Sequence, residues 1–185
     1  MGFLEADALS KLGFKSIGTN VLISGDARIY NAANMVIGNN VRIDAFCILS
    51  AGDKPFILED NIHISAGVMI YGQYGFHMKS FTNISSACRV FTQSDSFTGE
   101  YMIGPTVPSK YRGVYGFPLV IEKHSVIGTG TTILPGAVIG EGVAVGANSL
   151  VKGECKPWSI YAGSPVKFIK ERSRKVIEFE KEYTQ

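Results

Sequence analysis

Three shortages in the sequence exclude whole classes of protein. The three cysteines, Cys47, Cys88 and Cys155, form an odd and widely spaced set, which favours reduced thiols in a cytoplasmic protein over a disulfide framework. A formal net charge of +2 gives no argument for a nucleic-acid partner. No apolar run reaches the roughly 18 residues that a membrane span needs, and the N-terminus lacks the pattern of a signal peptide.

The sequence does contain an internal repeat of six residues, clearest in "VIGTGTTILPGAVIGEGVAVGANSLV" at positions 126–151. An aliphatic residue opens each hexad, and a small or β-branched residue follows four positions later. The opening residues are Ile121, Ile127, Ile133, Ile139, Val145 and Val151. This period is typical of a β-helix, in which each hexad forms a short strand and a corner. We expect the aliphatic side chains to stack inward, and glycines such as Gly128 and Gly140 to provide tight bends with positive φ.

The repeat and its interruptions organise the chain, residues 1–185, as a single domain. Leucines at helical spacing predict an N-terminal helical cap in residues 1–16, and the β-helix is expected over 17–163. The dipeptide "SP" that opens residues 164–185 has the pattern of a helix start and predicts a C-terminal α-helix. The repeat disappears in residues 95–118, whose aromatic content argues against disorder, so we expect an arm that lines a site or a subunit contact.

These hexads, followed by "VGANSLVKGECKPWSIYAGSPVKFIK", resemble the hexapeptide-repeat acyltransferases over nearly the whole chain. The resemblance implies an all-β solenoid, a left-handed parallel β-helix, assembled as a homotrimer that uses acetyl-CoA and no metal. The segments "LSKLGFKSIGTNVLIS" and "SDSFTGEYMIGPTVP" further resemble the branch that acetylates sugars, with its galactoside-type and maltose-type O-acetyltransferases. That branch implies a sugar or nucleotide-sugar acceptor, used for O-antigen or capsule synthesis.

The resemblance also implies a groove for CoA between two subunits, along the later coils. The matching positions of this chain are Thr129, Ala147, Lys152, Lys167 and Lys170. Backbone groups at the hexad corners would hold the pantetheine arm, and the lysines would bind the phosphates as point charges. The alternative interpretation of Lys167 and Lys170 is a solvated helix face.

The sequence departs from the galactoside-type pattern at the catalytic base. Those relatives place a histidine where this chain reads "VFTQSDSF". His63 is the last residue of its hexad and is expected to face outward. It matches a position from which relatives contact the sugar of the neighbouring subunit, so it is the candidate base. Ser65 beside it is a candidate sugar contact. Ser94 and Tyr101 are further candidate substrate contacts. Asp95 would orient the His63 imidazole or contact the sugar itself.

Three functions remain open at this point. The first is an acetyl-CoA-dependent sugar acetyltransferase, for which the missing histidine favours an amine acceptor, because an amine could lose its proton to water or to the leaving sulfur. The second is a metal enzyme of the carbonic-anhydrase type, which would need His63, His77 in an enlarged corner and an outward-facing His124 to meet at a subunit boundary. The third is a β-helix scaffold without activity.

Overall fold

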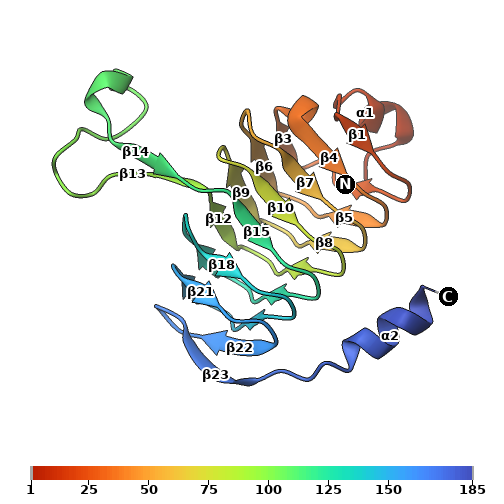
Figure 1. Cartoon of the computed structure of the whole chain (residues 1–185). Coiled ribbons are helices and arrows are strands. Elements are labelled where there is room, and N and C mark those ends of the chain that lie inside the picture. The colour runs from red at the N-terminus through yellow and green to blue at the C-terminus, as the bar shows by residue number, and fades with distance from the viewer. Residues whose placement is uncertain (1, 185) are drawn as a thin grey trace.

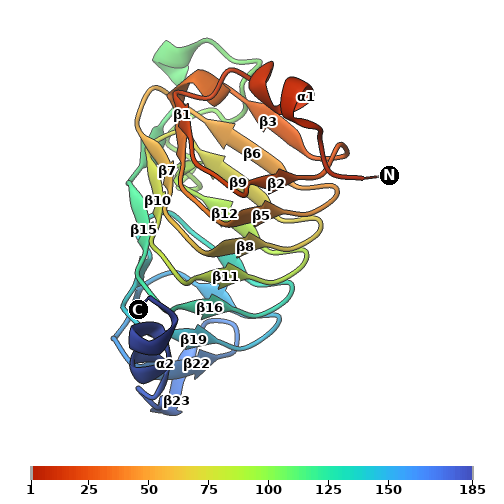
Figure 2. The same cartoon turned by 90° about the vertical axis from the view of Figure 1, so that its right-hand side faces the viewer.

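The chain is a left-handed parallel β-helix, seen in a computed structural model that describes residues 2–184. Short strands climb a three-sided prism and form three sheets, in which all strands but the last, β23, pair in parallel (Figures 1 and 2). The first sheet contains β1 (Ser16–Ile17), β4 (Met35–Ile37), β7 (Phe56–Leu58), β10 (Phe76–Met78), β15 (Leu119–Ile121), β18 (Val138–Ile139) and β21 (Glu154–Cys155). The second contains β2 (Leu22–Ile23), β5 (Val41–Ile43), β8 (Ile62–Ile64), β11 (Asn83–Ile84), β16 (Val126–Ile127), β19 (Ala144–Val145), β22 (Ser159–Ala162) and β23 (Lys167–Glu171). The third contains β3 (Arg28–Tyr30), β6 (Ile48–Ala51), β9 (Met69–Gly72), β12 (Arg89–Phe91), β17 (Thr132–Ile133) and β20 (Leu150–Val151).

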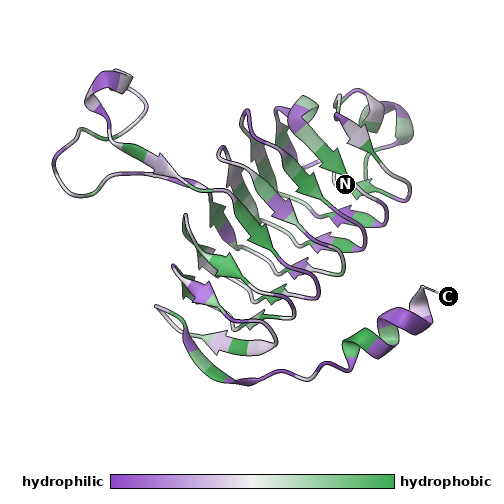
Figure 3. Cartoon of the chain, viewed as in Figure 1, coloured by the Kyte–Doolittle hydropathy of each residue, from purple (hydrophilic) through white to green (hydrophobic). Residues whose placement is uncertain are grey.

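The core consists of the inward stacks that the six-residue repeat predicts. In the second sheet Ile43 pairs with Ile64, and Ile84 pairs with both Ile64 and Ile127, so each aliphatic side chain lies on the one a coil away. All four are fully buried. Each such side chain contributes about 1.5–3 kcal/mol through burial, and apolar residues accordingly concentrate along the strands (Figure 3). The prediction of inward stacking is confirmed.

The corner between the first and second sheets has a residue in the left-handed conformation in each coil. These residues are Asn20, Asn40, Asn61, Phe81, His124, Gly142 and Trp158. Asparagine tolerates positive φ well, and the Asn20 amide donates to the Asn40 side chain at 2.8 Å, extending the ladder from coil to coil. The expectation that Gly128 and Gly140 supply positive φ is wrong. A Cβ on Gly128 would lie 2.6 Å from the Ala147 nitrogen, so close packing between coils, rather than φ, demands glycine there.

An arm leaves the prism at the corner after β12 (Figure 1). It begins as β13 (Gln93–Asp95) and returns as β14 (Val114–Gly116), and the two strands pair antiparallel with Asp95 opposite Val114. A 3-10 turn, Ser109–Tyr111, lies between them; another, Ala32–Asn34, lies between β3 and β4. None of residues 96–113 is buried, so the arm contributes little to the core.

The two ends of the chain differ from the helices that the sequence predicts. The N-terminal helix α1 (Ala6–Ser10) is short, while Leu4, Leu9 and Leu12 pack against the end of the core; Met1 lies outside the described residues. A helix from residue 164 is wrong: β23 pairs antiparallel with β22, and α2 begins only at its bounds, Val176–Tyr183. The unpaired edge of β22 has backbone groups that need partners, and a returning strand satisfies them.

Candidate active site

The base of the arm encloses a cavity of about 460 Å³, which we call the arm-base cavity. Its floor comes from β9 and β12, where the rings of Tyr71 and Phe91 stack with centroids 5.4 Å apart. Its walls come from the arm. The lining residues are Tyr71, Gln73, Phe91, Gln93, Ser94, Asp95, Phe97, Ile103, Pro105, Arg112 and Val114. The cavity therefore exists only because a non-repeating segment folds back over two strands of the prism.

Three polar side-chain atoms in the arm-base cavity are shielded from solvent without a hydrogen-bond partner. They are Asp95 Oδ1, Gln73 Oε1 and Arg112 Nε, and among residues 2–184 no other side-chain nitrogen or oxygen is in this state. The other Asp95 oxygen, Oδ2, accepts from the Gly104 amide at 3.2 Å. Leaving such groups unpaired costs about 1–3 kcal/mol each, more for a charge, so their gathering in one cavity indicates a site for a polar ligand.

Two other predicted substrate contacts lie on the arm. Ser94 lines the arm-base cavity, although its hydroxyl donates to the Asp95 carbonyl oxygen at 3.0 Å. Tyr101 lies in the outer part of the arm, outside this cavity, and is half exposed against Gly113. The structure thus brings together Ser94 and Asp95 but places Tyr101 apart from them.

His63 lies on the outward face of β8, away from the arm. Its Nε2 is 2.8 Å from Asp44 Oδ2, and Arg42 Nε donates to the other Asp44 oxygen at 2.8 Å. Burial opposes the ionisation of Asp44, yet the hydrogen bonds from His63 and Arg42 hold its pKa below the ordinary value. Ser65 follows directly after β8. Within one chain His63 therefore has Asp44, not Asp95, as its carboxylate partner.

The other two histidines also pair with carboxylates. His77 lies in β10 rather than in an enlarged corner, with Nε2 2.7 Å from Glu59 Oε1. His124 is buried, which corrects the expectation that it faces outward, because α2 covers it and places Glu180 Oε2 2.8 Å from its Nε2. The three histidines are thus separated within the chain, and over residues 2–184 no three His, Cys, Asp or Glu side chains gather as metal ligands.

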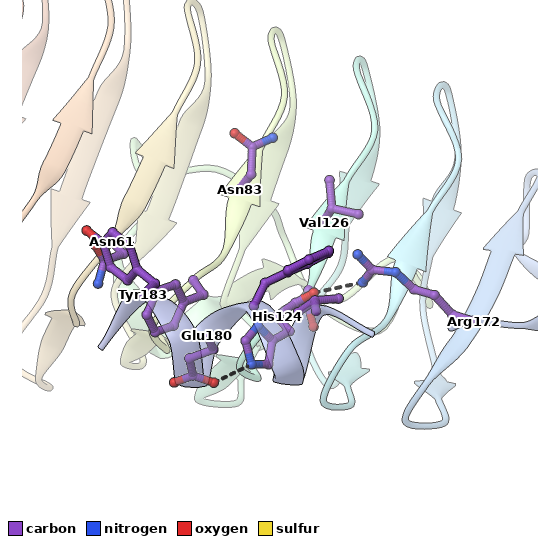
Figure 4. A pocket seen from close by; sticks show the side chains of 11 residues that line it. Asn61, Asn83, His124, Val126, Arg172, Glu180 and Tyr183 are labelled. Atoms are coloured by element: carbon purple, nitrogen blue, oxygen red, sulfur yellow. Dashed lines mark hydrogen bonds and ion pairs between the residues drawn. The ribbon is translucent and has the colours of Figure 1, made fainter. Parts of the chain in front are cut away.

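A second cavity, of about 450 Å³, lies between α2 and the prism (Figure 4). Figure 4 shows the Glu180 carboxylate pointing to His124 from the helix. Arg172, in the segment before α2, donates through Nη1 to the carbonyl oxygens of His124 at 2.7 Å and Gly142 at 2.9 Å. This cavity holds none of the site residues that the sequence predicts, and its polar contacts serve to dock the C-terminal segment.

The predicted CoA positions lie at the opposite end of the prism from α1. Thr129 and Ala147 are exposed and occupy the same corner in successive coils, where the Asn148 amide donates to the Thr129 carbonyl oxygen at 2.8 Å. Lys152, Lys167 and Lys170 are exposed, the last two on β23. The arrangement gives a ridge of corner backbone that leads toward a basic strand.

Comparison with known proteins identifies the family. Residues 118–153 match the model "Bacterial transferase hexapeptide (six repeats)", and residues 34–71 match "Hexapeptide repeat of succinyl-transferase". An Escherichia coli dTDP-4-amino-4,6-dideoxy-D-glucose acyltransferase is 41% identical over 97% of this chain and 94% of its own length. The chain belongs to the hexapeptide-repeat acyltransferases. The putative lipopolysaccharide biosynthesis O-acetyl transferase WbbJ of E. coli K12 is more distant, at 31% identity over 86% of this chain and 80% of its own.

Solved structures of a related acyltransferase agree in fold over the whole chain. AntD, an N-acyltransferase from Bacillus cereus, in complex with dTDP and 3-hydroxybutyryl-CoA, superposes with a TM-score of 0.94 at 46% identity, covering 99% of this chain and 96% of that one. A variant of AntD in complex with dTDP-4-amino-4,6-dideoxyglucose and coenzyme A gives a TM-score of 0.95 at 45% identity, covering 99% and 97%. The protein is therefore an acyltransferase, and an inactive scaffold is excluded as its description.

Sequence reasoning missed three residues that the structure places at these sites. Asp44 could have been found from the register of the repeat, because Arg42 pairs with His63 one coil on and Asp44 follows two positions after Arg42. Gln73 and Arg112 had no local signal, because only the return of the arm brings them to one cavity.

In the part of the chain that the structure describes, no helix is long and apolar enough to cross a lipid bilayer.

Proposed function

We propose that this acyltransferase transfers an acetyl or other short acyl group from acyl-CoA to the amino group of a nucleotide-linked sugar, a precursor of a cell-surface glycan. The relatives with CoA and dTDP-sugar complexes support this acceptor and donor. The observation that carries it is Asp95 in the arm-base cavity, a carboxylate with one oxygen fixed by Gly104 and the other unpaired. A carboxylate oxygen in that position accepts N–H bonds and suits an amine.

The chemistry follows from these groups. The amine nitrogen attacks the thioester carbonyl carbon, the new C–N bond forms, and the C–S bond then breaks to release the CoA thiol. Asp95 Oδ1 would accept one N–H of the acceptor and aim the nitrogen lone pair at the thioester. The nitrogen must give up a proton, which a base or the departing sulfur can take. Asp95 thus acts chiefly in binding and orientation.

We further propose that the active enzyme is a homotrimer in which each site uses two subunits. Thr129 and Ala147 would hold the pantetheine arm along the corner ridge, and Lys152, Lys167 and Lys170 its phosphates. His63, with Ser65 beside it, would reach the acceptor only from a neighbouring copy, because in its own chain it lies away from the arm. Its Nε2 bonds to Asp44, so Nδ1 is the nitrogen that could accept a proton.

The alternative acceptor is a sugar hydroxyl. WbbJ, named as an O-acetyl transferase, supports this alternative. An alcohol is harder to deprotonate than an amine and depends more strongly on a base beside it, and the arm-base cavity of one chain holds no histidine of its own. The amine is therefore the favoured acceptor. Three free, buried cysteines support a cytoplasmic location.

The experiment is a thiol-release assay with acetyl-CoA and dTDP-4-amino-4,6-dideoxyglucose, run beside the sugar that has a hydroxyl in place of the amine. We expect turnover with the amine and at least about 100-fold less with the hydroxyl. Asp95→Asn should lower kcat/KM for the amine by about 100-fold and leave acetyl-CoA binding unchanged. Equal turnover of both sugars, or an unaffected Asp95→Asn enzyme, contradicts the proposal.

A further inference from the structure

The arm-base cavity contains a second recognition element beyond Asp95. We infer that Gln73 and Arg112 together bind the ring hydroxyl next to the reacting amine, so that the enzyme selects acceptors with a vicinal amino alcohol. This inference rests on the proposed function, since it names a feature of the acceptor in that site. It makes Gln73 and Arg112 specificity-determining residues for the reaction.

The Gln73 amide is held by a hydrogen bond to its neighbour Ser50. Its Nε2 donates to the Ser50 hydroxyl at 3.2 Å, which leaves Oε1 as the atom without a partner. The backbone around it is also held, because the Tyr74 amide donates to Thr92 Oγ1 at 2.9 Å. Gln73 Oε1 thus presents a hydrogen-bond acceptor to the cavity.

Arg112 presents the opposite polarity from the other wall. Its amide donates to the Ser109 carbonyl oxygen at 3.0 Å, and its backbone bridges Met102 across the arm, so the root of the side chain is fixed. Its Nε–H is shielded and unpaired, and no carboxylate lies within ion-pair distance of the guanidinium among the described residues. Arg112 therefore presents a charged donor that has not been neutralised by Asp95.

One chemical group satisfies both atoms. A hydroxyl donates one hydrogen bond and accepts others, so it can donate to Gln73 Oε1 while accepting from Arg112 Nε. An amine next to it can donate to Asp95 Oδ1. The stacked rings of Tyr71 and Phe91 then provide an apolar surface for the C–H face of a sugar ring. The three orphaned atoms thus supply the acceptors and the donor that an amine and a neighbouring hydroxyl need, which for this 4-amino sugar is the 3-hydroxyl.

The test compares dTDP-4-amino-4,6-dideoxyglucose with its 3-deoxy counterpart. For the wild-type enzyme we expect kcat/KM to fall about 10- to 100-fold when the hydroxyl is absent, the loss expected for two buried hydrogen bonds of which one is charged. In the Gln73→Met and Arg112→Lys enzymes the preference for the sugar with the 3-hydroxyl should be mostly lost, so that kcat/KM for the two sugars differs by less than about threefold. Arg28→Met, at an exposed strand position on the third sheet, is the control and should keep the wild-type ratio.

The ratio of the two sugars separates recognition from folding, because a merely damaged enzyme loses activity on both equally. Wild-type enzyme that acylates both sugars equally well overturns the inference while leaving the proposed function intact. The inference is also overturned if the Gln73→Met and Arg112→Lys enzymes both keep the wild-type ratio of kcat/KM for the two sugars. Wild-type enzyme that acylates neither sugar overturns the proposed function itself.

Discussion

His63 Nε2 lies 2.8 Å from Asp44 Oδ2, on the outward face of two paired strands. Because a carboxylate only accepts, Nε2 carries the hydrogen and Nδ1 is left as the basic nitrogen. Arg42 Nε holds the second Asp44 oxygen at 2.8 Å and keeps the carboxylate in place. A histidine oriented in this way by a carboxylate can accept a proton, and in the proposed trimer it would do so in the site of a neighbouring copy.

His63→Ala should lower kcat for amine acylation by about 100-fold while leaving the dissociation constant for acetyl-CoA unchanged. His77→Ala is a matched control, since His77 also lies on a strand and pairs with a carboxylate, at 2.7 Å. An unchanged kcat in His63→Ala would assign proton removal to water or to the leaving sulfur.

The C-terminal helix should be docked by a pH-dependent contact. Glu180 bonds to Lys123 and His124, and the hydrogen bond from Lys123, opposed by burial and aided by His124, lowers the pKa of Glu180 from its ordinary 4.5. A lowered carboxyl pKa stabilises the folded form at pH values above the unfolded pKa, and that contribution disappears as pH falls through the folded pKa. The docked helix is therefore most stable at neutral pH.

Glu180→Gln should raise amide hydrogen exchange in α2 about 5- to 30-fold at pH 7, equivalent to about 1–2 kcal/mol. The difference from wild type should shrink as the pH is lowered into the acidic range, because the wild-type carboxylate then becomes protonated and loses the contact. Glu178→Gln, in the exposed first turn of the same helix, serves as the control. Equal exchange in wild type and Glu180→Gln at pH 7 would show that this contact does not hold the helix.

The β-helix could be predicted from the sequence because the six-residue period recurs from coil to coil. A hexad such as that of Ile127 repeats the same physical demand, an inward aliphatic side chain over the one before it. The C-terminus could not be predicted in the same way. The segment after Ser164 has a local helix-start pattern, but the open edge of β22 captures Lys167–Glu171 as a strand. The unpaired backbone groups lie on β22 and not in the segment itself, so the local sequence of that segment does not predict the pairing.

The candidate site was predictable only where a position follows the family pattern. Asp95 could be named as a candidate because it stands in a segment that resembles sugar-acetylating relatives, and its role stays a prediction. Gln73 and Arg112 come from a strand end and from the far side of the arm, and their unpaired atoms are visible only when the arm closes over Tyr71 and Phe91. The repeat predicts the scaffold, whereas the candidate site lies in a segment that interrupts the repeat. The fold of such a segment cannot be predicted from periodicity.

The basic strand β23 should set the affinity for the acyl donor. Replacing Lys167 and Lys170 together with alanine should raise KM for acetyl-CoA about tenfold with little change in kcat, because exposed lysines act as point charges on phosphate. The effect should shrink in 0.5 M salt, where the screening distance is about half of its physiological value. Lys11→Ala, at the opposite end of the prism, is the control. An unchanged KM in low salt would assign these lysines to a solvated face.

The arm should be dispensable for folding and necessary for the acceptor. Asp95 and Val114 face each other across the β13–β14 pair, so an Asn-Gly turn can join them in place of residues 96–113. The shortened protein should keep its thermal stability within a few degrees, since none of the removed residues is buried, and should still bind acetyl-CoA. Its kcat/KM for the amino sugar should fall at least about 100-fold, because it lacks Arg112 and the walls of the arm-base cavity. A retained kcat/KM would show that the acceptor does not bind at the arm. A shortened protein that binds neither substrate and no longer unfolds cooperatively would show that the arm is needed for folding.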